Sequence, residues 1–435
     1  MLKKKTQLAL AVAAAVGLTA PAAQATTGYF SHGYGAVQGG MGGAGVALPQ
    51  DAMIGAINPA GMVMTGTHGV IGAAAFSPLR KYTVSGAARV PTPTAFPPFA
   101  GGPVESDNKI FLIPNFAYNW MLNDDSSVGV TVFGNGGMNT EYMDADTPFG
   151  IGTFGGGGAG DPNAGVDYAQ LFINTTYARK IGAKGAVGIS AIVNYSRFKA
   201  DGLAGFGGFS TAPTKLSNNG YDTDWGFGVK VGVLGEVAPG FTVGASAQTK
   251  IKNKMDKYAG LFAKGGQFDI PATATVGIAY AVSKSTKIAV DVQKIWYNDV
   301  DAIGNASGKL LTCFGGVVSD CLGGATGAGF GWNNMTVIKV GLQHEAGNGW
   351  TWRAGFATGD QPIDPSEVTL NILAPGVMEE HFTLGIGKKL GNGREFNAAF
   401  MYAPSVSVTG PSLFVAGDTI KLEMKQYQFQ AELKF

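Results

Sequence analysis

The side chains that could do chemistry are few in this chain, and their types favour binding over catalysis. The four histidines, His32, His68, His344 and His381, are not spaced as metal ligands. No combination of serine, histidine and aspartate, no phosphate loop and no dinucleotide fingerprint occurs in a credible context. The sequence therefore predicts a protein that is not an enzyme, and it gives no reason to expect a metal or a cofactor.

Two cations are the strongest candidates for a binding site. Lys339 and Arg353 lie in segments that alternate between apolar and polar residues, so both side chains point to the same polar interior. A guanidinium group can hold a carboxylate through two parallel hydrogen bonds, which makes the pair a possible head-group site for an anionic ligand. The alternative is pairing with interior carboxylates such as Asp291, Glu395 or Glu432. We rank that pairing higher, because buried charges are usually paired.

Large apolar side chains also gather in two segments between predicted strands, residues 199–220 and 252–270. On exposed segments such side chains need a reason. They could form a groove that collects a greasy ligand, which we favour, or they could pack against each other. The residues concerned are Leu203, Phe206, Phe209, Tyr258, Leu261 and Phe262. The second segment also holds lysines that could attract a carboxylate or bind anionic lipopolysaccharide, namely Lys250, Lys252, Lys254, Lys257 and Lys264.

The two cysteines, Cys313 and Cys321, lie close together in the sequence. In an oxidising compartment they predict a small disulfide that staples a loop. Two cysteines alone are too few for a structural zinc site, and we prefer loop stapling to any redox role.

The elements that must position these residues are β-strands. Beyond His68, about fourteen segments have strand character, and short Asn-, Asp- and Gly-containing connections alternate with long ones. A soluble sandwich gives no reason for every second connection to be long, whereas an outer-membrane barrel has tight turns at one rim and long loops at the other. The predicted strands are approximately 68–81, 110–121, 127–137, 166–180, 184–198, 221–237, 240–251, 271–281, 285–297, 332–345, 349–358, 378–390, 394–403 and 421–435.

The last predicted strand shows the two faces most clearly. From 426 to 434 its even-numbered residues are glutamine, glutamate or lysine, while Tyr427, Phe429 and Leu433 lie on the other face. One face would meet lipid and the other the lumen. The same alternation turns three apolar side chains to the lumen, where they could line a greasy passage or pack on the N-terminal segment: Phe172, Ile192 and Met401. Aromatic residues near strand ends predict an interfacial girdle: Tyr118, Trp120, Trp296, Tyr297, Trp350 and Tyr402.

Composition and targeting agree with export to a membrane. Charged residues make up 14% of the chain, against about a quarter in soluble domains. The balance of 31 basic and 30 acidic residues gives no reason to expect a nucleic-acid partner. Residues 1–25 have the pattern of a cleaved signal peptide, with an early lysine run, a short apolar core and an A-x-A site. No later apolar run approaches the length of a membrane helix.

Residues 26–67 differ from the strands that follow. They are dense in glycine and alanine, with neither strand alternation nor a helical stripe, yet they are too apolar for a solvated linker. They predict a hatch packed inside the barrel, where small residues let the backbone lie close to the walls. The predicted organisation is a signal peptide at 1–25, an N-terminal hatch at 26–67 and an all-β transmembrane antiparallel barrel at 68–435.

A glycine-rich run, Gly134, Asn135, Gly136 and Gly137, lies at the end of the third predicted strand. Glycine in a strand marks a bulge or a bend, and a bulge interrupts ladder pairing. An unpaired stretch between neighbouring strands is what a side opening would require. The alternative, an ordinary transition from strand to loop, stays open.

Four stretches, in this order, resemble the FadL family of outer-membrane transporters for long-chain fatty acids and hydrocarbons. The resemblance covers nearly the whole chain after the signal peptide, and the terminal Phe435 also matches outer-membrane assembly signals. The stretches are the N-terminal segment with Asn58, Pro59 and Ala60, residues 222–280 with WGFGVKVGVLGEVAPGFTVGASAQTKI, residues 291–305 with DVQKIWYNDVDAIGN, and residues 350–387 with WTWRAGFATGDQPI.

The resemblance implies a fourteen-stranded barrel closed by an N-terminal hatch. It implies passage of apolar molecules, released sideways into the membrane beside a kinked third strand. Asn58, Pro59 and Ala60 would then lie against that kink and help to gate the exit; otherwise Asn58 only caps a hatch turn. We therefore expect a monomer in the outer membrane of a Gram-negative bacterium, among lipid and lipopolysaccharide, taking up long-chain fatty acids or similar hydrophobic compounds by diffusion.

Two other functions stay open. The same fold could carry monoaromatic hydrocarbons or alkanes, and a cargo without a carboxylate would leave Lys339 and Arg353 dispensable for binding. A general porin or structural barrel would instead conduct ions, whereas a hatch should keep conductance low. An outer-membrane enzyme such as a lipase is a distant third, because no reactive serine or aspartate can be placed near a histidine in the lumen.

Overall fold

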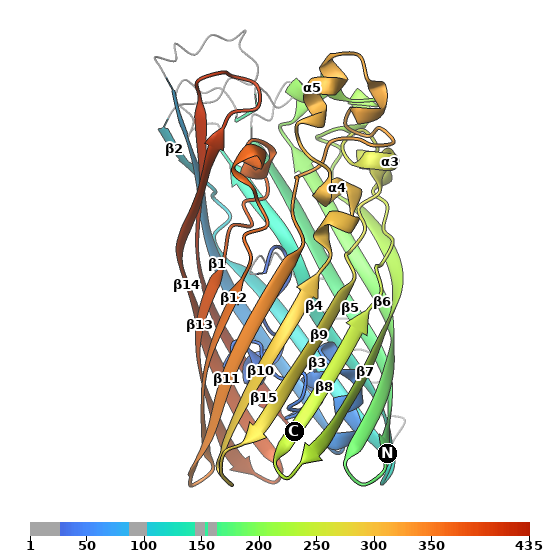
Figure 1. The fold of residues 1–435 in the computed structure, drawn as a ribbon, viewed down its shortest axis with the longest axis vertical. Helices are drawn as coiled ribbons and strands as arrows, with labels where there is room; N and C mark the ends of the chain where they lie inside the picture. Colours follow the sequence, from blue (N-terminus) through green and yellow to red (C-terminus); the bar gives the residue numbers. More distant parts are fainter. Residues whose placement is uncertain (1–26, 87–101, 144–152, 155–162) are drawn as a thin grey trace.

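The computed structural model describes residues 27–86, 102–143, 153–154 and 163–435, and the predicted signal peptide lies outside them. Within these ranges the chain forms one sheet in which each strand pairs antiparallel with the next, and the last strand pairs with the first to close a barrel (Figure 1). A short strand, β2, adds to the outer end of β1 and leaves fourteen long strands around the barrel among the described residues. The predicted fourteen-stranded antiparallel barrel is therefore confirmed.

The strands have these bounds: β1 (His68–Ser85), β2 (Gly102–Glu105), β3 (Phe111–Asn123), β4 (Ser126–Tyr142), β5 (Ala164–Ile181), β6 (Gly185–Asp201), β7 (Asp222–Ala238), β8 (Phe241–Gln248), β9 (Thr273–Ala281), β10 (Thr286–Ile295), β11 (Met335–Gly347), β12 (Trp350–Gly359), β13 (Glu380–Gly391), β14 (Arg394–Pro411) and β15 (Thr419–Lys434). Every predicted strand is present. Several strands, β14 most of all, run further toward the long loops than predicted. They are longer than the roughly 9–11 residues that a strand needs to span a bilayer.

Tight turns join the strands at one rim, which we call the turn rim, and long connections join them at the other, the loop rim (Figure 1). Asn348 and Asn392 have positive φ values of 49° and 51° in two of the tight turns. Asparagine tolerates this left-handed conformation better than most residues, and it suits the twist of a hairpin. Among the described residues, the structure contains no helix long and apolar enough to cross a membrane.

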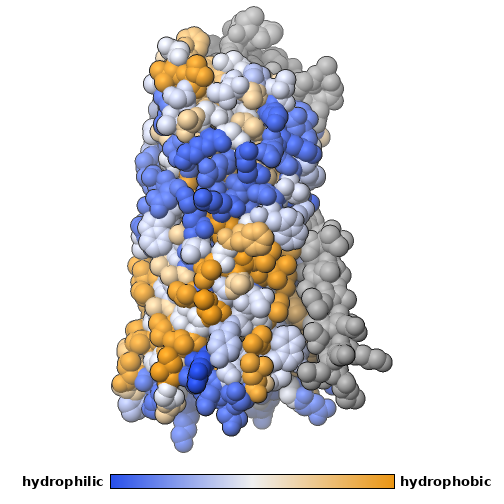
Figure 2. All heavy atoms as spheres, turned by 90° about the vertical axis from the view of Figure 1, so that its right-hand side faces the viewer, coloured by the Kyte–Doolittle hydropathy of each residue, from blue (hydrophilic) through white to orange (hydrophobic). Residues whose placement is uncertain are grey.

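The barrel wall separates an apolar outer face from a polar lumen. On β11 the outward Ile338, Val340 and Leu342 are exposed, while Lys339 and Gln343 between them are buried. The glutamines of β15 are likewise buried in the lumen. Figure 2 shows an apolar belt in the half of the visible face nearer the turn rim, with a hydrophilic band above it. The belt is the surface that lipid would cover.

The N-terminal segment, residues 27–67, lies inside the barrel toward the turn rim, and most of its residues are buried (Figure 1). It contains the short helix α2 (Gly35–Gly39) and two 3₁₀ turns, η1 (Ala52–Ala56) and η2 (Pro59–Met64). Asp51 caps η1 by accepting from the Met53 amide, and Asn58 caps η2 by accepting from the Ala60 amide. Such caps satisfy amides that a short helix leaves unpaired.

The long connections fold over the loop rim as short helices, most of them on one side of it (Figure 1). Cys313 and Cys321 form the predicted disulfide, at an S–S distance of 2.01 Å. The short elements here are η5 (Ala204–Phe209), η6 (Pro213–Lys215), η7 (Asp256–Tyr258), α3 (Ala263–Gly266), η8 (Tyr297–Asp299), α4 (Asp301–Gly304), α5 (Lys309–Phe314), η9 (Val318–Asp320), η10 (Pro365–Glu367) and η11 (Leu370–Ile372).

One residue of the predicted aromatic girdle lies elsewhere. Trp350 is 39% exposed on the barrel surface, but Tyr297 is completely buried. Tyr297 follows the end of β10, where the chain has turned inward, and its hydroxyl donates to the Thr27 carbonyl oxygen at 2.6 Å. Its proximity to a strand end in the sequence does not distinguish a lipid-facing ring from one that anchors the N-terminal segment.

Candidate functional site

The glycine-rich run bends β4 into the lumen. The pairing of β4 with β5 shifts between Gly134 and Gly136, so Asn135 is the extra residue of a bulge. Pairing then resumes and β4 continues to Tyr142, so the expectation that the run ends the strand is wrong. Every residue from Thr131 to Thr140 is buried, on both faces of the strand. Both faces of this part of β4 are therefore covered, and from Gly134 onward the strand pairs with β5 and no longer with β3.

The bend interrupts the ladder between β3 and β4. Their pairing ends at Asn115 and Phe133, although β3 continues to Phe111 in pairing with β1. Among the described residues, no ladder pair joins Phe111–Pro114 of β3 to the part of β4 that runs from Gly134 to Tyr142. We call this interruption the side gap. Leu112, which is 57% exposed on the outer face, borders it.

The first described residues of the chain occupy the edge of β4 that β3 leaves free. The Ser31 amide donates to the Asn135 carbonyl oxygen at 3.0 Å, and the Gly137 amide donates to the Tyr29 carbonyl oxygen at 2.9 Å. A Cβ at Gly136 would lie 1.9 Å from that Tyr29 oxygen, so only glycine permits this approach. Residues 29–31 therefore serve as a short substitute strand behind the side gap.

Aromatic side chains hold these residues in place. The ring of Tyr29 lies 5.0 Å from that of Tyr297, 5.9 Å from that of Trp332 and 6.0 Å from that of Tyr168. The Tyr29 amide also donates to the Tyr297 hydroxyl at 3.1 Å. Since Tyr297 and Trp332 come from the connection between β10 and β11, the loop-rim chain and the N-terminal segment meet beside the side gap.

An apolar pocket adjoins the side gap on the luminal side. It lies between β1, β4, β15 and the connection between β12 and β13, and its cavity volume of about 10 Å³ is small. Its one charged lining residue is Arg80. The other lining residues are apolar or small, with Asn139 as the exception: Phe76, Pro78, Gly137, Met138, Asn139, Trp332, Ala374, Pro375, Gly376 and Met424.

The side chain of Arg80 reaches across the outer end of the side gap. Its Nη1 donates to the Asn139 carbonyl oxygen in β4, and its Nη2 donates to the Asn108 carbonyl oxygen in the connection before β3. The guanidinium lies 5.7 Å from the centre of the Phe111 ring. Its Nε has no hydrogen-bond partner. No carboxylate of the described residues forms a salt bridge with it.

The Asn58, Pro59 and Ala60 tripeptide packs on β6 and β7, away from the bend in β4. The Asn58 side chain donates to the Val46 carbonyl oxygen at 2.8 Å and to the Val233 carbonyl oxygen of β7 at 3.1 Å. Gly232 provides the space, because a Cβ there would lie 2.0 Å from Asn58 Oδ1. The hydrogen bonds to the bulge of β4 come from Tyr29–Ser31. A gating role for the tripeptide stays a prediction.

The predicted head-group cations have internal partners. Lys339 donates to the His32 carbonyl oxygen at 2.9 Å. Arg353 donates to Gln343 and Asn397 at 2.8 and 2.9 Å, and it lies 3.7 Å from Glu395. This internal pairing of Arg353 is the alternative that the sequence ranked higher. Lys339 joins the wall to the N-terminal segment, Arg353 joins β12 to β11 and β14, and neither cation lines the apolar pocket.

The carboxylates of the lumen bind backbone amides of the N-terminal segment. Asp291 accepts from the Gly45 and Val46 amides at 2.8 and 2.9 Å, and Glu432 accepts from the Ala36 amide at 2.9 Å. Carboxyl oxygens accept hydrogen bonds from backbone amides, so these contacts anchor the segment to β10 and β15.

The apolar residues of the two loops face inward. Leu203, Phe206, Tyr258 and Phe262 are buried, and Phe209 and Leu261 are half-buried. Phe262 stacks on Phe268 with ring centres 4.3 Å apart. In this conformation the side chains pack against each other, as in the second interpretation. Phe172, Ile192 and Met401 are buried at their predicted luminal positions.

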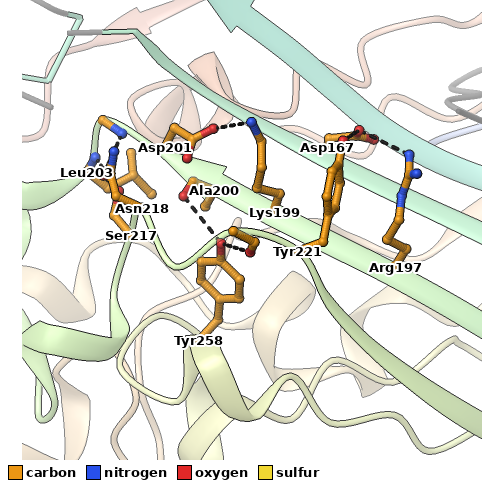
Figure 3. Close-up of polar contacts among 12 residues, drawn as sticks. Asp167, Arg197, Lys199, Ala200, Asp201, Leu203, Ser217, Asn218, Tyr221 and Tyr258 are labelled. Carbon is orange, nitrogen blue, oxygen red and sulfur yellow. Dashed lines mark hydrogen bonds and ion pairs between the residues drawn. The ribbon is translucent and has the colours of Figure 1, made fainter. Parts of the chain in front are cut away.

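Polar contacts fasten the first loop to the rim, as Figure 3 shows. The amides of Gly202 and Leu203 donate to Asn218 and Ser217 across the loop. The Tyr258 hydroxyl, from the second loop, donates to the Gly220 carbonyl oxygen at 2.6 Å. Salt bridges join Arg197 to Asp167 at 3.2 Å and Lys199 to Asp201 at 2.5 Å. Three of the five clustered lysines are also paired: Lys250 with Asp269, Lys254 with Asp256, and Lys264 with Asp301.

The sequence analysis missed Arg80 and Trp332. A signal for Arg80 exists, because β1 alternates from Phe76 to Val84 with its even-numbered residues buried. An arginine on the same face as Phe76, Tyr82 and Val84 is a cation among apolar side chains. The predicted strand 332–345 begins at Trp332, but β11 begins at Met335, so strand alternation does not show which way the Trp332 side chain turns.

Known proteins resemble this chain both in sequence and in fold. Curated relatives include long-chain fatty acid transport proteins of Salmonella typhi, 22% identical over 350 residues, and of Escherichia coli K12, 22% identical over 359 residues; each alignment covers 74% of both chains. Solved structures of the same fold include a Pseudomonas aeruginosa FadL homologue, with a TM-score of 0.68, 14% identity and coverage of 94% of this chain and 99% of that one. The Pseudomonas putida toluene transporter TodX has a TM-score of 0.64, 15% identity and coverage of 93% and 98%.

A family model described as an outer membrane protein transport protein (OMPP1/FadL/TodX) matches residues 13–411. This match spans most of the chain and includes the N-terminal segment and the bulge in β4. The chain therefore belongs to the OMPP1/FadL/TodX family of outer-membrane transport proteins, whose members are transport channels and not enzymes.

Proposed function

We propose that this protein carries long-chain fatty acids or similar hydrophobic compounds through the outer membrane by passive diffusion and releases them sideways into the bilayer. The observation that carries the proposal is the side gap next to the apolar pocket. The pocket is lined by Gly137, Met138 and Asn139, which are also the residues of β4 beside the gap.

A side exit suits an apolar cargo. Exposing one buried methylene to water costs about 0.8 kcal/mol, so a long alkyl chain crossing an aqueous mouth would meet a large barrier. Passing from the pocket between β3 and β4 would keep the chain in apolar surroundings. Leu112 on the outer face of β3 continues the apolar path to the lipid.

The gate in this proposal is the substitute strand at Tyr29–Ser31. It blocks the luminal side of the side gap with two backbone hydrogen bonds to β4. Residues 27–67 act as the hatch, Asn58 fixes the hatch to β7, and movement of the gate does not require the whole hatch to leave. Gly134, Asn135, Gly136 and Gly137 supply the bend that makes the opening.

Capture at the loop rim would require the two loops to separate. Their apolar side chains are buried in each other, so Leu203, Phe206 and Phe262 would meet a ligand only after that rearrangement. The unpaired charge of the lysine cluster would face lipopolysaccharide, and the protein would act as a monomer because one barrel contains the complete route.

The proteins that this chain resembles include transporters of both kinds of cargo, namely a long-chain fatty acid transport protein and a toluene transporter. A general porin is disfavoured, because the N-terminal segment lies in the lumen toward the turn rim. The buried cation Arg80 in the pocket favours an acidic cargo over a neutral one.

The test is uptake of labelled oleate and labelled toluene by cells that lack their own transporter, with and without this protein. We expect oleate uptake that depends on the protein, and a loss of most of it when Gly134, Asn135 and Gly136 are replaced to straighten β4. Uptake of toluene alone would move the function to hydrocarbons. Uptake of neither, together with large ion conductance, would reject the proposal in favour of a porin.

A further inference from the structure

We propose that the outer surface of β1 and β15, on the loop-rim side of the apolar belt, binds a phosphate group of lipid A, the membrane-embedded part of lipopolysaccharide. We call this surface the lysine groove; its lining includes Leu79, Lys81, Glu105, Lys109, Glu423 and Lys425. Other elements form the lysine cluster between β8 and β9, so the two surfaces are separate. The inference goes beyond the proposed function and does not depend on which cargo the protein carries.

The lysine groove has room for a phosphate group. Its cavity volume is about 220 Å³, whereas roughly 10–15 Å³ of such space is enough for one water molecule. The groove lies where β2 adds to the outer end of β1, at the upper left of the barrel in Figure 1. The long loops of an outer-membrane barrel face the outside of the cell. The lipid nearest to the groove is therefore that of the outer leaflet.

Aromatic rings place the groove at the level of the lipid head groups. The Nζ of Lys425 lies 5.1 Å from the centre of the Tyr427 ring and 5.6 Å from that of the Tyr402 ring. The next outward residues toward the turn rim are the exposed Phe429 and Phe400. Tyrosines mark the boundary between hydrocarbon and head groups in membrane proteins. Lys425 is thus held at the level where the charges of a lipid lie.

The groove has more lysines than carboxylates to pair with them. Glu423 is shared by Lys81 at 3.5 Å and Lys421 at 3.0 Å, and no salt bridge of the described residues includes Lys425. Because Lys81 pairs with Glu423 across the ladder between β1 and β15, it is the diagonal neighbour of Lys425. Such neighbours are about 7–8 Å apart. Two long lysine side chains at that spacing can donate to one phosphate, which would supply the missing negative charge.

The surface on the turn-rim side of the groove suits an acyl chain, which favours a lipid over free phosphate. Leu79 is exposed at the groove, and Ala75 is exposed on the same face of β1, nearer the turn rim. Ala75 pairs with Phe429 of β15 on one side and with Leu112 of β3 on the other. Because alanine is small, it leaves space for a chain between these two larger side chains. A lipid A molecule bound through its phosphate would lay an acyl chain there, next to the side gap.

The experiment measures binding of lipid A to the full-length mature protein in detergent micelles by native mass spectrometry. The ligands are lipid A with its phosphates and the same lipid A after their removal, and inorganic phosphate is the competitor. Lys425→Gln, Lys81→Gln and their double variant are compared with Lys388→Gln. Lys388 is a matched control, because it also lies over an aromatic ring, that of Trp350 at 4.6 Å, but at the turn rim. Heat-modified gel mobility confirms that each barrel is folded.

We expect Lys425→Gln to weaken lipid A binding by about fivefold, as the loss of one lysine beside an anionic head group would. The double variant should lose more, and Lys425→Arg should keep most of the affinity. Lys388→Gln should bind as wild type. Lipid A without phosphates should bind weakly and to the same extent in all variants. Inorganic phosphate at millimolar concentration should leave bound lipid A in place.

Equal affinity of wild type and the double variant for lipid A would overturn the inference, and so would equal binding of lipid A with and without its phosphates. Displacement by inorganic phosphate would show a site for the free anion and reject the lipid as its ligand. A loss in Lys388→Gln as large as that in Lys425→Gln would mean that lipid A follows positive charge anywhere on the barrel, which would also reject the lysine groove as a site.

Discussion

At the scale of single residues, Gly136 sets how closely the N-terminal segment can approach β4. We predict that Gly136→Ala displaces Tyr29–Ser31, because the new Cβ would lie 1.9 Å from the Tyr29 carbonyl oxygen. The bonds between residues 29–31 and β4 should then be lost. Hydrogen exchange at the Ser31 and Gly137 amides should become faster, while the rest of β4 and β5 stays protected.

The matched control for that substitution is Gly208→Ala. Gly208 lies in a 3₁₀ turn at the loop rim, and a Cβ there would meet no atom within 4 Å. Its variant should exchange as wild type throughout β4. Unchanged protection of Ser31 in Gly136→Ala would mean that the approach seen at Gly136 does not determine how the segment docks.

For single residues, the direction of a side chain could be predicted from the sequence more readily than its partners. Strand alternation correctly turns Lys339 and Arg353 into the lumen, since side chains of a strand alternate between its faces. It cannot show that Lys339 meets a carbonyl oxygen of His32, some three hundred positions away, because that contact depends on how the N-terminal segment folds inside the finished barrel.

At the scale of elements, we expect the stability of the disulfide-bonded tip of the connection between β10 and β11 to depend on pH. Hydrogen bonds from the hydroxyls of Thr326 and Thr312, at 2.6 and 2.7 Å, hold the pKa of Asp320 below its ordinary value of 3.8. A carboxyl whose pKa is lowered in the folded state supports that state above its unfolded pKa and loses this contribution as the pH falls.

We therefore predict that the tip loosens below about pH 4, whereas the barrel does not. Residues 309–326 should become more open to acid protease between pH 5 and pH 3, measured by mass spectrometry of the fragments. Asp320→Asn should remove most of this pH dependence. If wild type and Asp320→Asn respond alike, another group controls the tip.

Elements differ in how far the sequence predicts them. The fourteen long strands follow from alternation and turn residues, which are local signals. The bend of β4 follows only in part: Gly134–Gly137 predict a bulge, but the strand continues because β5 supplies new partners from Gln170 onward. The fold of the N-terminal segment is set by contacts with distant strands, such as Asp291 with Gly45, and no local pattern contains them.

At the scale of the whole molecule, the N-terminal segment should determine whether the barrel conducts ions. It lies in the lumen toward the turn rim and is anchored to the wall by Asp291, Glu432 and Lys339. We predict low conductance for the complete protein in planar bilayers. Deletion of residues 27–66 from the mature chain should raise the conductance by about tenfold or more, because barrels of similar size without a plug leave an aqueous channel.

Two further measurements secure that comparison. The deletion variant must retain the mobility of a folded barrel on gels, which its closed ladder between β1 and β15 should allow. The variant Asn58→Ala, which loses the bond to the Val233 carbonyl oxygen, should show brief openings and no permanent pore. A complete protein that conducts as well as the deletion variant would contradict the role of the segment as a hatch.

The position of the side gap also has a consequence for the direction of traffic. The proposed exit, from an apolar pocket past Leu112 into lipid, would join two phases in which the cargo has a similar chemical potential. Exchange across such an exit obeys partition, and it runs both ways. Net uptake then depends on how quickly the cell consumes the cargo, and a loaded membrane would return cargo outward along the same route.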